Sequence, residues 1–105
     1  MAPLRRGPSA DYAKIKIVDD YMKAHKATWT ASTTRVMRIR VHHFNRWLNA
    51  AKINLCEIQA ADVNAYWRYL ISKEASDITV IQYQATIKRF LRWLAINGRI
   101  SRTAV

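Results

Sequence analysis

Four segments of the chain carry apolar residues at the three- and four-residue spacing of an amphipathic helix. They run from Asp11 to about His25, from about Ser32 to Ala51, from about Ala60 to Lys73 and from about Ile78 to Ile96. The sequence has only two glycines and two prolines, so the body of the chain lacks the turn residues that many short strands require. The pattern therefore predicts an all-α domain, a bundle of four main helices.

The second and fourth segments repeat one pattern at an offset of 46 residues. Each contains Phe-x-Arg-Trp-Leu, at residues 44–48 and again at 90–94. At the same offset Thr33 matches Thr79, and the apolar stripes align position by position. Helical repeat arrays need about three copies to be stable, so two copies favour two pseudo-repeated helical hairpins packed as one bundle.

The positive charge is concentrated in these two repeated segments. The formal net charge is +11, and residues 32–52 and 78–105 each contain five basic residues and no acidic one. A helix exposed to solvent usually mixes acids with bases, because pairs one turn apart stabilise it. Two helices with bases alone indicate a polyanionic partner, although a solvated basic surface is the alternative.

The basic residues fall opposite the apolar stripes, which gives a set of candidate DNA contacts. We expect arginine and lysine to meet phosphates, which position a protein on DNA, and Gln82 and Thr86 to meet base edges. Thr33 and Thr79 stand at helix starts, where a capping hydroxyl can also hold a phosphate. The full candidate set is Thr33, Arg35, Arg38, His42, Arg46, Thr79, Gln82, Thr86, Lys88, Arg89 and Arg92.

Other chemistry is weakly supported by the sequence. Trp47 and Trp93 lie beside the apolar stripes, so we expect core packing rather than base stacking, and Cys56 in an apolar connector is expected to be buried. Trp29 is expected to cover one end of the core. The three histidines lack further ligands at metal spacing, and no nucleophile–base pair stands out, so neither a metal site nor a catalytic site is predicted.

The order of these motifs resembles the N-terminal core-binding, SAM-like domain of tyrosine recombinases and phage integrases. The resemblance covers roughly residues 10–102 and rests on three passages. They are Thr33, Met37, Val41, Phe44 and Trp47-Leu48; then Leu55, Ile58, Asp62-Val63, Tyr66 and Leu70; then Thr79, Ile87 to Leu94 and Gly98-Arg99-Ile100. The family commonly has Asn-Pro shortly afterwards, whereas this chain has Thr103-Ala104.

The resemblance implies a role in DNA integration and recombination. The second and fourth helices would lie across the major groove of double-stranded DNA, on one side of a clamp. The clamp would be closed by a C-terminal catalytic domain of the same polypeptide, and protomers would assemble into a synaptic tetramer. The catalytic Arg, His-x-x-Arg and nucleophilic Tyr of that domain are missing from these 105 residues. The chain alone is therefore not expected to be an enzyme, and the family's chemistry needs no cofactor.

The remaining expectations concern organisation and location. Residues 1–9 are expected to form a flexible basic arm, residues 10–102 the DNA-binding domain and residues 103–105 the start of a linker. With no signal peptide and no apolar run of membrane-spanning length, we expect a cytoplasmic, nucleoid-associated protein without a membrane partner. Two alternatives stay open, a stand-alone helical DNA-binding regulator and a basic protein on anionic membranes.

Overall fold

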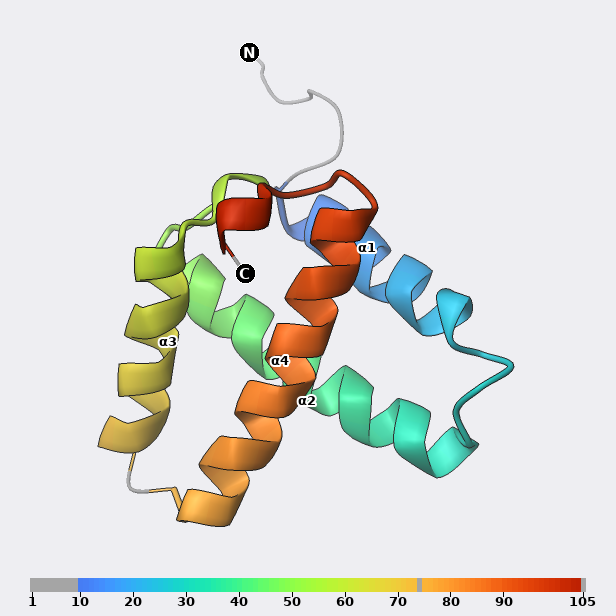
Figure 1. The fold of residues 1–105 in the computed structure, drawn as a ribbon, viewed down its shortest axis with the longest axis horizontal. Coiled ribbons are helices and arrows are strands. Elements are labelled where there is room, and N and C mark those ends of the chain that lie inside the picture. The colour runs from blue at the N-terminus through green and yellow to red at the C-terminus, as the bar shows by residue number, and fades with distance from the viewer. Residues whose placement is uncertain (1–9, 74, 105) are drawn as a thin grey trace.

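The structure is a computed structural model that describes residues 10–73 and 75–104. It has four α-helices, α1 (Ala10–Ala24), α2 (Ala31–Ala50), α3 (Ala60–Ser72) and α4 (Asp77–Ile96), and two single-turn 3₁₀ helices, η1 (Leu55–Glu57) and η2 (Arg102–Ala104) (Figure 1). The described residues form no strand. The all-α prediction is confirmed, with every helix boundary within one residue of the expected one. The expected basic arm, residues 1–9, lies outside the described residues.

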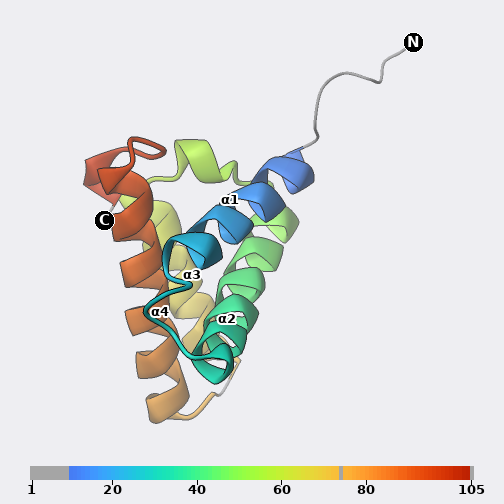
Figure 2. The same cartoon turned by 90° about the vertical axis from the view of Figure 1, so that its right-hand side faces the viewer.

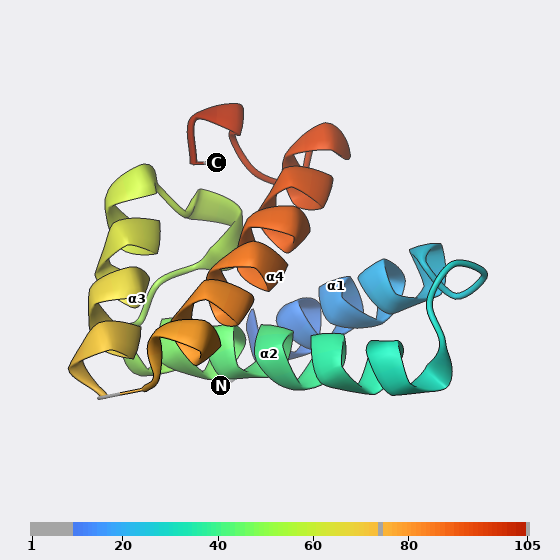
Figure 3. The ribbon, with the colours of Figure 1, turned by 60° about the horizontal axis from the view of Figure 1, so that its bottom comes forward.

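The two repeated helices form the centre of the bundle. Helix α4 crosses α2 near the middle of both (Figure 1), and α1 and α3 flank this pair on opposite sides (Figures 2 and 3). The apolar stripes of all four helices meet between them. The fully buried core side chains are Val18, Tyr21, Val41, Phe44, Leu48, Leu55, Ile58, Tyr66, Ile87, Phe90, Leu91 and Leu94. Each helix therefore keeps one face for the core and one for solvent.

The repeat extends to the first turns of α2 and α4. Thr30 is the N-cap of α2, and its hydroxyl oxygen accepts a hydrogen bond from the Thr33 amide at 3.1 Å. Ser76, 46 residues later, caps α4 and accepts from the Thr79 amide at the same distance. Each cap satisfies one of the amide groups that a helix start leaves without a partner. Both helices then run for 20 residues.

The last turns of α2 and α4 are also equivalent. After α2, the Lys52 amide donates to the Asn49 carbonyl at 3.1 Å and the Ile53 amide to the Leu48 carbonyl at 2.9 Å. After α4, Gly98 and Arg99 make the corresponding bonds at 3.1 and 2.8 Å. This is the Schellman motif, which places one residue in the left-handed region. Here that residue is Gly98 with φ 69° and, at the equivalent position, Lys52 with φ 59°.

The connector between α2 and α3 corrects one prediction. Leu55 and Ile58 are buried, as expected, whereas Cys56 is exposed. In the 3₁₀ turn of η1, side chains three residues apart eclipse one another, so Leu55 and Ile58 both point inward and the intervening Cys56 points to solvent. Apolar neighbours in the sequence did not determine which side of the turn the thiol occupies.

The tryptophans pack as predicted. Trp47 and Trp93 are partly buried against the core, with ring centroids 5.3 Å from Tyr66 and 5.2 Å from Tyr21 respectively. Trp29, just before α2, contacts Tyr21 edge-on and covers that end of the core. Their indole rings are therefore committed to packing.

At the other end of the chain, Ala104 in η2 is buried, so the packed unit continues past residue 102.

Candidate nucleic-acid interface

Arg40 on α2 connects the two crossing helices. Its Nη1 donates a hydrogen bond to the Thr86 hydroxyl oxygen at 2.9 Å, and its Nη2 lies 3.5 Å from Gln82 Oε1. The guanidinium carbon lies 5.8 Å from the centroid of the Tyr83 ring, within cation–π range. The crossing thus places a cation, an amide and a hydroxyl together.

Thr86 occupies a different position from the one expected. Its side chain is only 4% exposed, and its hydroxyl oxygen also lies 3.6 Å from Met37 Sδ. The prediction that Thr86 stands on the outer basic face is therefore wrong. Helix α2 crosses α4 at this level, which widens the buried face of α4 beyond the stripe that periodicity defines.

Sequence reasoning missed Arg40, because it lies between the apolar stripe and the outer face of α2. The repeat itself contained the missing information. Arg40 and Thr86 occupy equivalent positions of the repeat, 46 residues apart, and these equivalent positions meet where α2 and α4 cross. A search for polar pairs at the repeat offset would have identified this contact.

The outer face of α2 is less uniformly basic than the sequence suggested. Arg35 and Arg46 are exposed and make no ion pair with any described residue. Between them lie Ile39, with 54% of its surface exposed, and the half-buried His42. Burial lowers the pKa of His42, and the charges of Arg38 and Arg46 lower it further, so this imidazole is neutral at pH 7.

Arg38 is directed toward α1 rather than toward the outer face of α2. Its Nη1 lies 2.9 Å from Asp19 Oδ1, and both side chains are about half exposed. The ion pair fixes the guanidinium beside the junction of α1 and α2 without burying it. An exposed pair of this kind adds little stability, because water and salt screen both charges.

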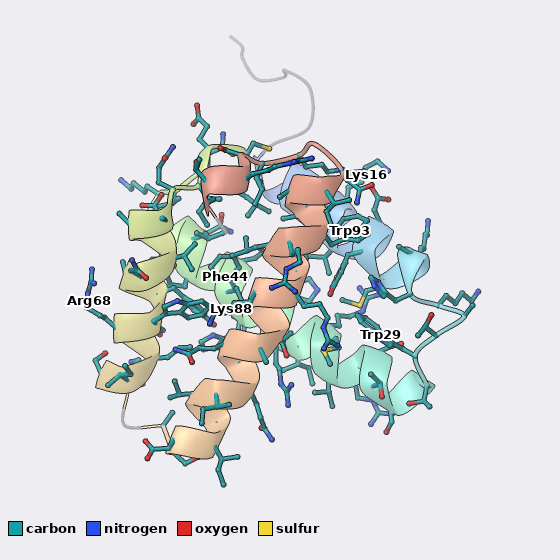
Figure 4. All side chains as sticks on the ribbon, viewed as in Figure 1. Lys16, Trp29, Phe44, Arg68, Lys88 and Trp93 are labelled. Atoms are coloured by element: carbon teal, nitrogen blue, oxygen red, sulfur yellow. The ribbon has the colours of Figure 1, made fainter. Side chains whose placement is uncertain are left out.

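The basic residues of α4 divide between two sides of the helix. Lys88, which points from α4 toward α3 (Figure 4), lies one turn from Arg92. Both line a hollow of about 430 Å³ between α4, α3 and η2, whose wall includes Val63, Trp67 and Leu91. Arg89 lies on the α1 side, close enough for its charge to act on the Tyr21 hydroxyl. Lys88, Arg89, Arg92 and Gln82 are all exposed. None of these three cations forms an ion pair in the part of the chain that is described.

Thr33 and Thr79 are first-turn residues rather than the caps themselves. The Thr30 hydroxyl donates to Thr33 Oγ1 at 3.0 Å, and the Ser76 hydroxyl donates to Thr79 Oγ1 at 2.8 Å. Each helix therefore begins with two linked hydroxyl groups at its N-terminus, where the amide groups of the first turn point out of the helix. That arrangement suits a phosphate at a helix N-terminus.

Two of the three histidines, His25 and His43, pack against aromatic rings. His43 Nδ1 lies 2.8 Å from the Tyr66 hydroxyl, and the His25 ring stacks on Trp29 at 4.3 Å. Burial, and secondarily the charge of Arg46, lowers the pKa of His43. Within residues 10–73 and 75–104, no three His, Cys, Asp or Glu side chains gather where they could hold a metal ion.

None of the helices in the described part of the chain is both long enough and apolar enough to cross a membrane.

A comparison with protein families identifies the class. The model of the phage integrase SAM-like domain matches residues 15–104, nearly the whole chain. The chain therefore belongs to the phage integrase SAM-like domain family, the N-terminal, non-catalytic part of integrases. Searches of curated proteins and of solved structures each returned no match.

Proposed function

We propose that this chain binds duplex DNA as the core-binding domain of a site-specific tyrosine recombinase or integrase. The observation that carries the proposal is the set of exposed cations on α2 and α4 that have no acidic partner among the described residues. These are Arg35, Arg46, Lys88, Arg89 and Arg92. Unpaired cations on both central helices repel one another, and a polyanion relieves that repulsion.

The proposed contacts follow from exposure. The five unpaired cations meet phosphates, and Thr33 and Thr79 offer phosphate sites at the starts of their helices. Gln82, exposed beside the crossing, is the residue best suited to a base edge, since an amide pairs with adenine through two hydrogen bonds. Arg40 joins this set because it lies within reach of Gln82, whereas the buried Thr86 positions Arg40 rather than touching DNA.

The proposal places strand cleavage outside this chain. A catalytic domain in the same polypeptide would supply the nucleophilic tyrosine and close the clamp on the far side of the duplex, without a metal or nucleotide cofactor. Protomers would meet in a synaptic tetramer, and the protein would work at the nucleoid. This chain would supply affinity for the duplex and would position the recombinase on it.

Salt dependence of DNA binding tests the proposal. Contacts with about five or six phosphates predict a slope near −5 in a plot of log affinity against log salt concentration. Substituting Arg89→Gln and Arg92→Gln together should lower the magnitude of the slope by about two and weaken binding to every duplex alike. Arg68→Gln is a single-charge control, because this exposed arginine points outward from α3 (Figure 4) and should leave the slope unchanged. A slope near zero for the unmodified protein would end the DNA-binding proposal.

A further inference from the structure

We propose that the junction of α1 and α2 forms a phosphate-binding pocket that adds a third helix to the DNA contact surface. Lys23, Lys26 and Arg38 surround a hollow of about 250 Å³, with Thr34 in its wall. Neither lysine belongs to the two basic helices. The inference rests on the proposed function and extends it to α1.

The two lysines are brought together by the way α1 ends. Lys23 lies in the last turn of α1, and the Lys26 amide donates to the Lys23 carbonyl at 3.2 Å in the turn that follows. His25 holds this turn in place through two contacts. Its Nδ1 lies 3.0 Å from the Tyr21 carbonyl oxygen, and its imidazole ring stacks on Trp29. The backbone that carries both ammonium groups is therefore fixed before any ligand arrives, which lowers the entropic cost of binding.

Arg38 completes the cationic wall from α2. Asp19 engages its Nη1 at 2.9 Å, and Nε and Nη2 have no hydrogen-bond partner among the described residues. Asp19 thus orients the guanidinium and leaves donors available. Three cations against this one carboxylate leave the lining with a charge of +2. The balance favours an anion.

The donors in the pocket match a phosphate group. A guanidinium can offer two parallel N–H donors to phosphate oxygens, and ammonium groups act as compact charges beside them. The Thr34 hydroxyl adds a neutral donor, and the buried Met22 closes one side of the hollow to water. The same chemistry would accept a DNA backbone phosphate or free inorganic phosphate, and the experiment below separates these two sources.

The first arm of the test measures duplex affinity against salt for Lys23→Gln/Lys26→Gln. Each lost phosphate contact should lower the magnitude of the slope by about one and weaken binding about eightfold at 0.1 M salt. The control, Arg68→Gln/Lys73→Gln, removes the same charge from two exposed positions, one on α3 and one directly after its last residue. Thermal melting of both variants confirms that each is folded.

The second arm follows amide NMR shifts of Lys23, Lys26 and Thr34 in sodium phosphate and in sodium chloride at equal ionic strength. Saturable shifts in phosphate alone, together with an unchanged duplex slope, would assign the pocket to free phosphate. A slope that falls only in the α1 variant assigns it to the DNA backbone. If the unmodified protein binds duplex, the α1 variant behaves like the control and phosphate causes no saturable shift, then the pocket proposal is wrong while the proposed function stands. If the unmodified protein does not bind duplex, the proposed function fails first.

Discussion

Replacing Lys52 with glycine should stabilise the domain. Lys52 has φ 59° in the Schellman motif that ends α2, whereas the equivalent residue after α4 is Gly98 with φ 69°. The two motifs share the same pair of hydrogen bonds, with lengths that agree within about 0.1 Å. The chain thus contains its own comparison of lysine and glycine in one backbone environment.

The expected magnitude follows from the backbone. A residue with a Cβ atom in the left-handed region costs about 1–2 kcal/mol, which Lys52→Gly removes. Glycine loses more conformational freedom on folding than lysine does, which reduces this gain by about 0.5–1 kcal/mol. The net gain in the free energy of unfolding is about 0.5–1 kcal/mol. The reverse change, Gly98→Ala, should cost a similar amount through φ alone, because an added Cβ meets no atom within 4 Å.

Urea unfolding followed by circular dichroism measures both effects, and Tm provides a second readout. A change of 1 kcal/mol shifts Tm by roughly 4–8 °C in a domain of this size. The double variant Lys52→Gly/Gly98→Ala should return close to the starting stability, because the two residues end different helices and no hydrogen bond between them is found in the described residues. A destabilised Lys52→Gly, with Gly98→Ala still costly, would show that the Lys52 side chain makes a favourable contact that outweighs its backbone strain.

Three further predictions concern buried polar groups. Tyr66→Phe should cost about 1 kcal/mol of unfolding free energy, because it removes the hydroxyl bonded to His43, whereas Tyr21→Phe should be neutral or stabilising, because the Tyr21 hydroxyl is buried with no partner in the described residues. Equal losses in urea unfolding would refute that contrast. Arg40→Met and Thr86→Val should show a coupling of about 1 kcal/mol in a double-mutant cycle, since each removes the same hydrogen bond, and strictly additive losses would contradict it. The folded state lowers the pKa of His43 below its ordinary 6.5, so as the pH falls from about 7 to 5 the unfolded state takes up the proton first and stability should fall. In a series of melting curves His43→Gln should reduce this fall, and an unchanged pH profile would exclude His43 as its source.

Apolar periodicity was sufficient to predict the helices of this domain. The stripes through Val41 and Phe44 and through Ile87 and Phe90 are buried as expected, because a helix with one apolar face has a single favourable way to pack. The cap residues then set the ends, with Ser76 and Gly98 bounding α4. These features are local in sequence, and sequence reasoning is accurate for them.

The two predictions that failed, the exposure of Thr86 and the burial of Cys56, concern positions whose environment is not set by the apolar stripe of one helix. The burial of Thr86 depends on where α2 crosses α4. The ion pair that turns Arg38 toward Asp19 of α1 was also not foreseen from the sequence, whereas the phosphate contact expected of Arg38 stays a prediction. Cys56 is exposed because of the phase of a single 3₁₀ turn. Periodicity along one helix contains no information on such contacts. The basic face inferred from the sequence is accordingly divided among the crossing, the outer face of α2, the α1 junction and the α3 side of α4.

The most direct test of the DNA-binding account is an amide NMR titration with a random duplex of about 20 base pairs at two salt concentrations. The account predicts salt-sensitive shifts on the two central helices, at Arg35, Arg46, Gln82, Lys88, Arg89 and Arg92. No shifts, or shifts confined to α3, would show that these basic residues are ordinary solvated surface and would contradict the account.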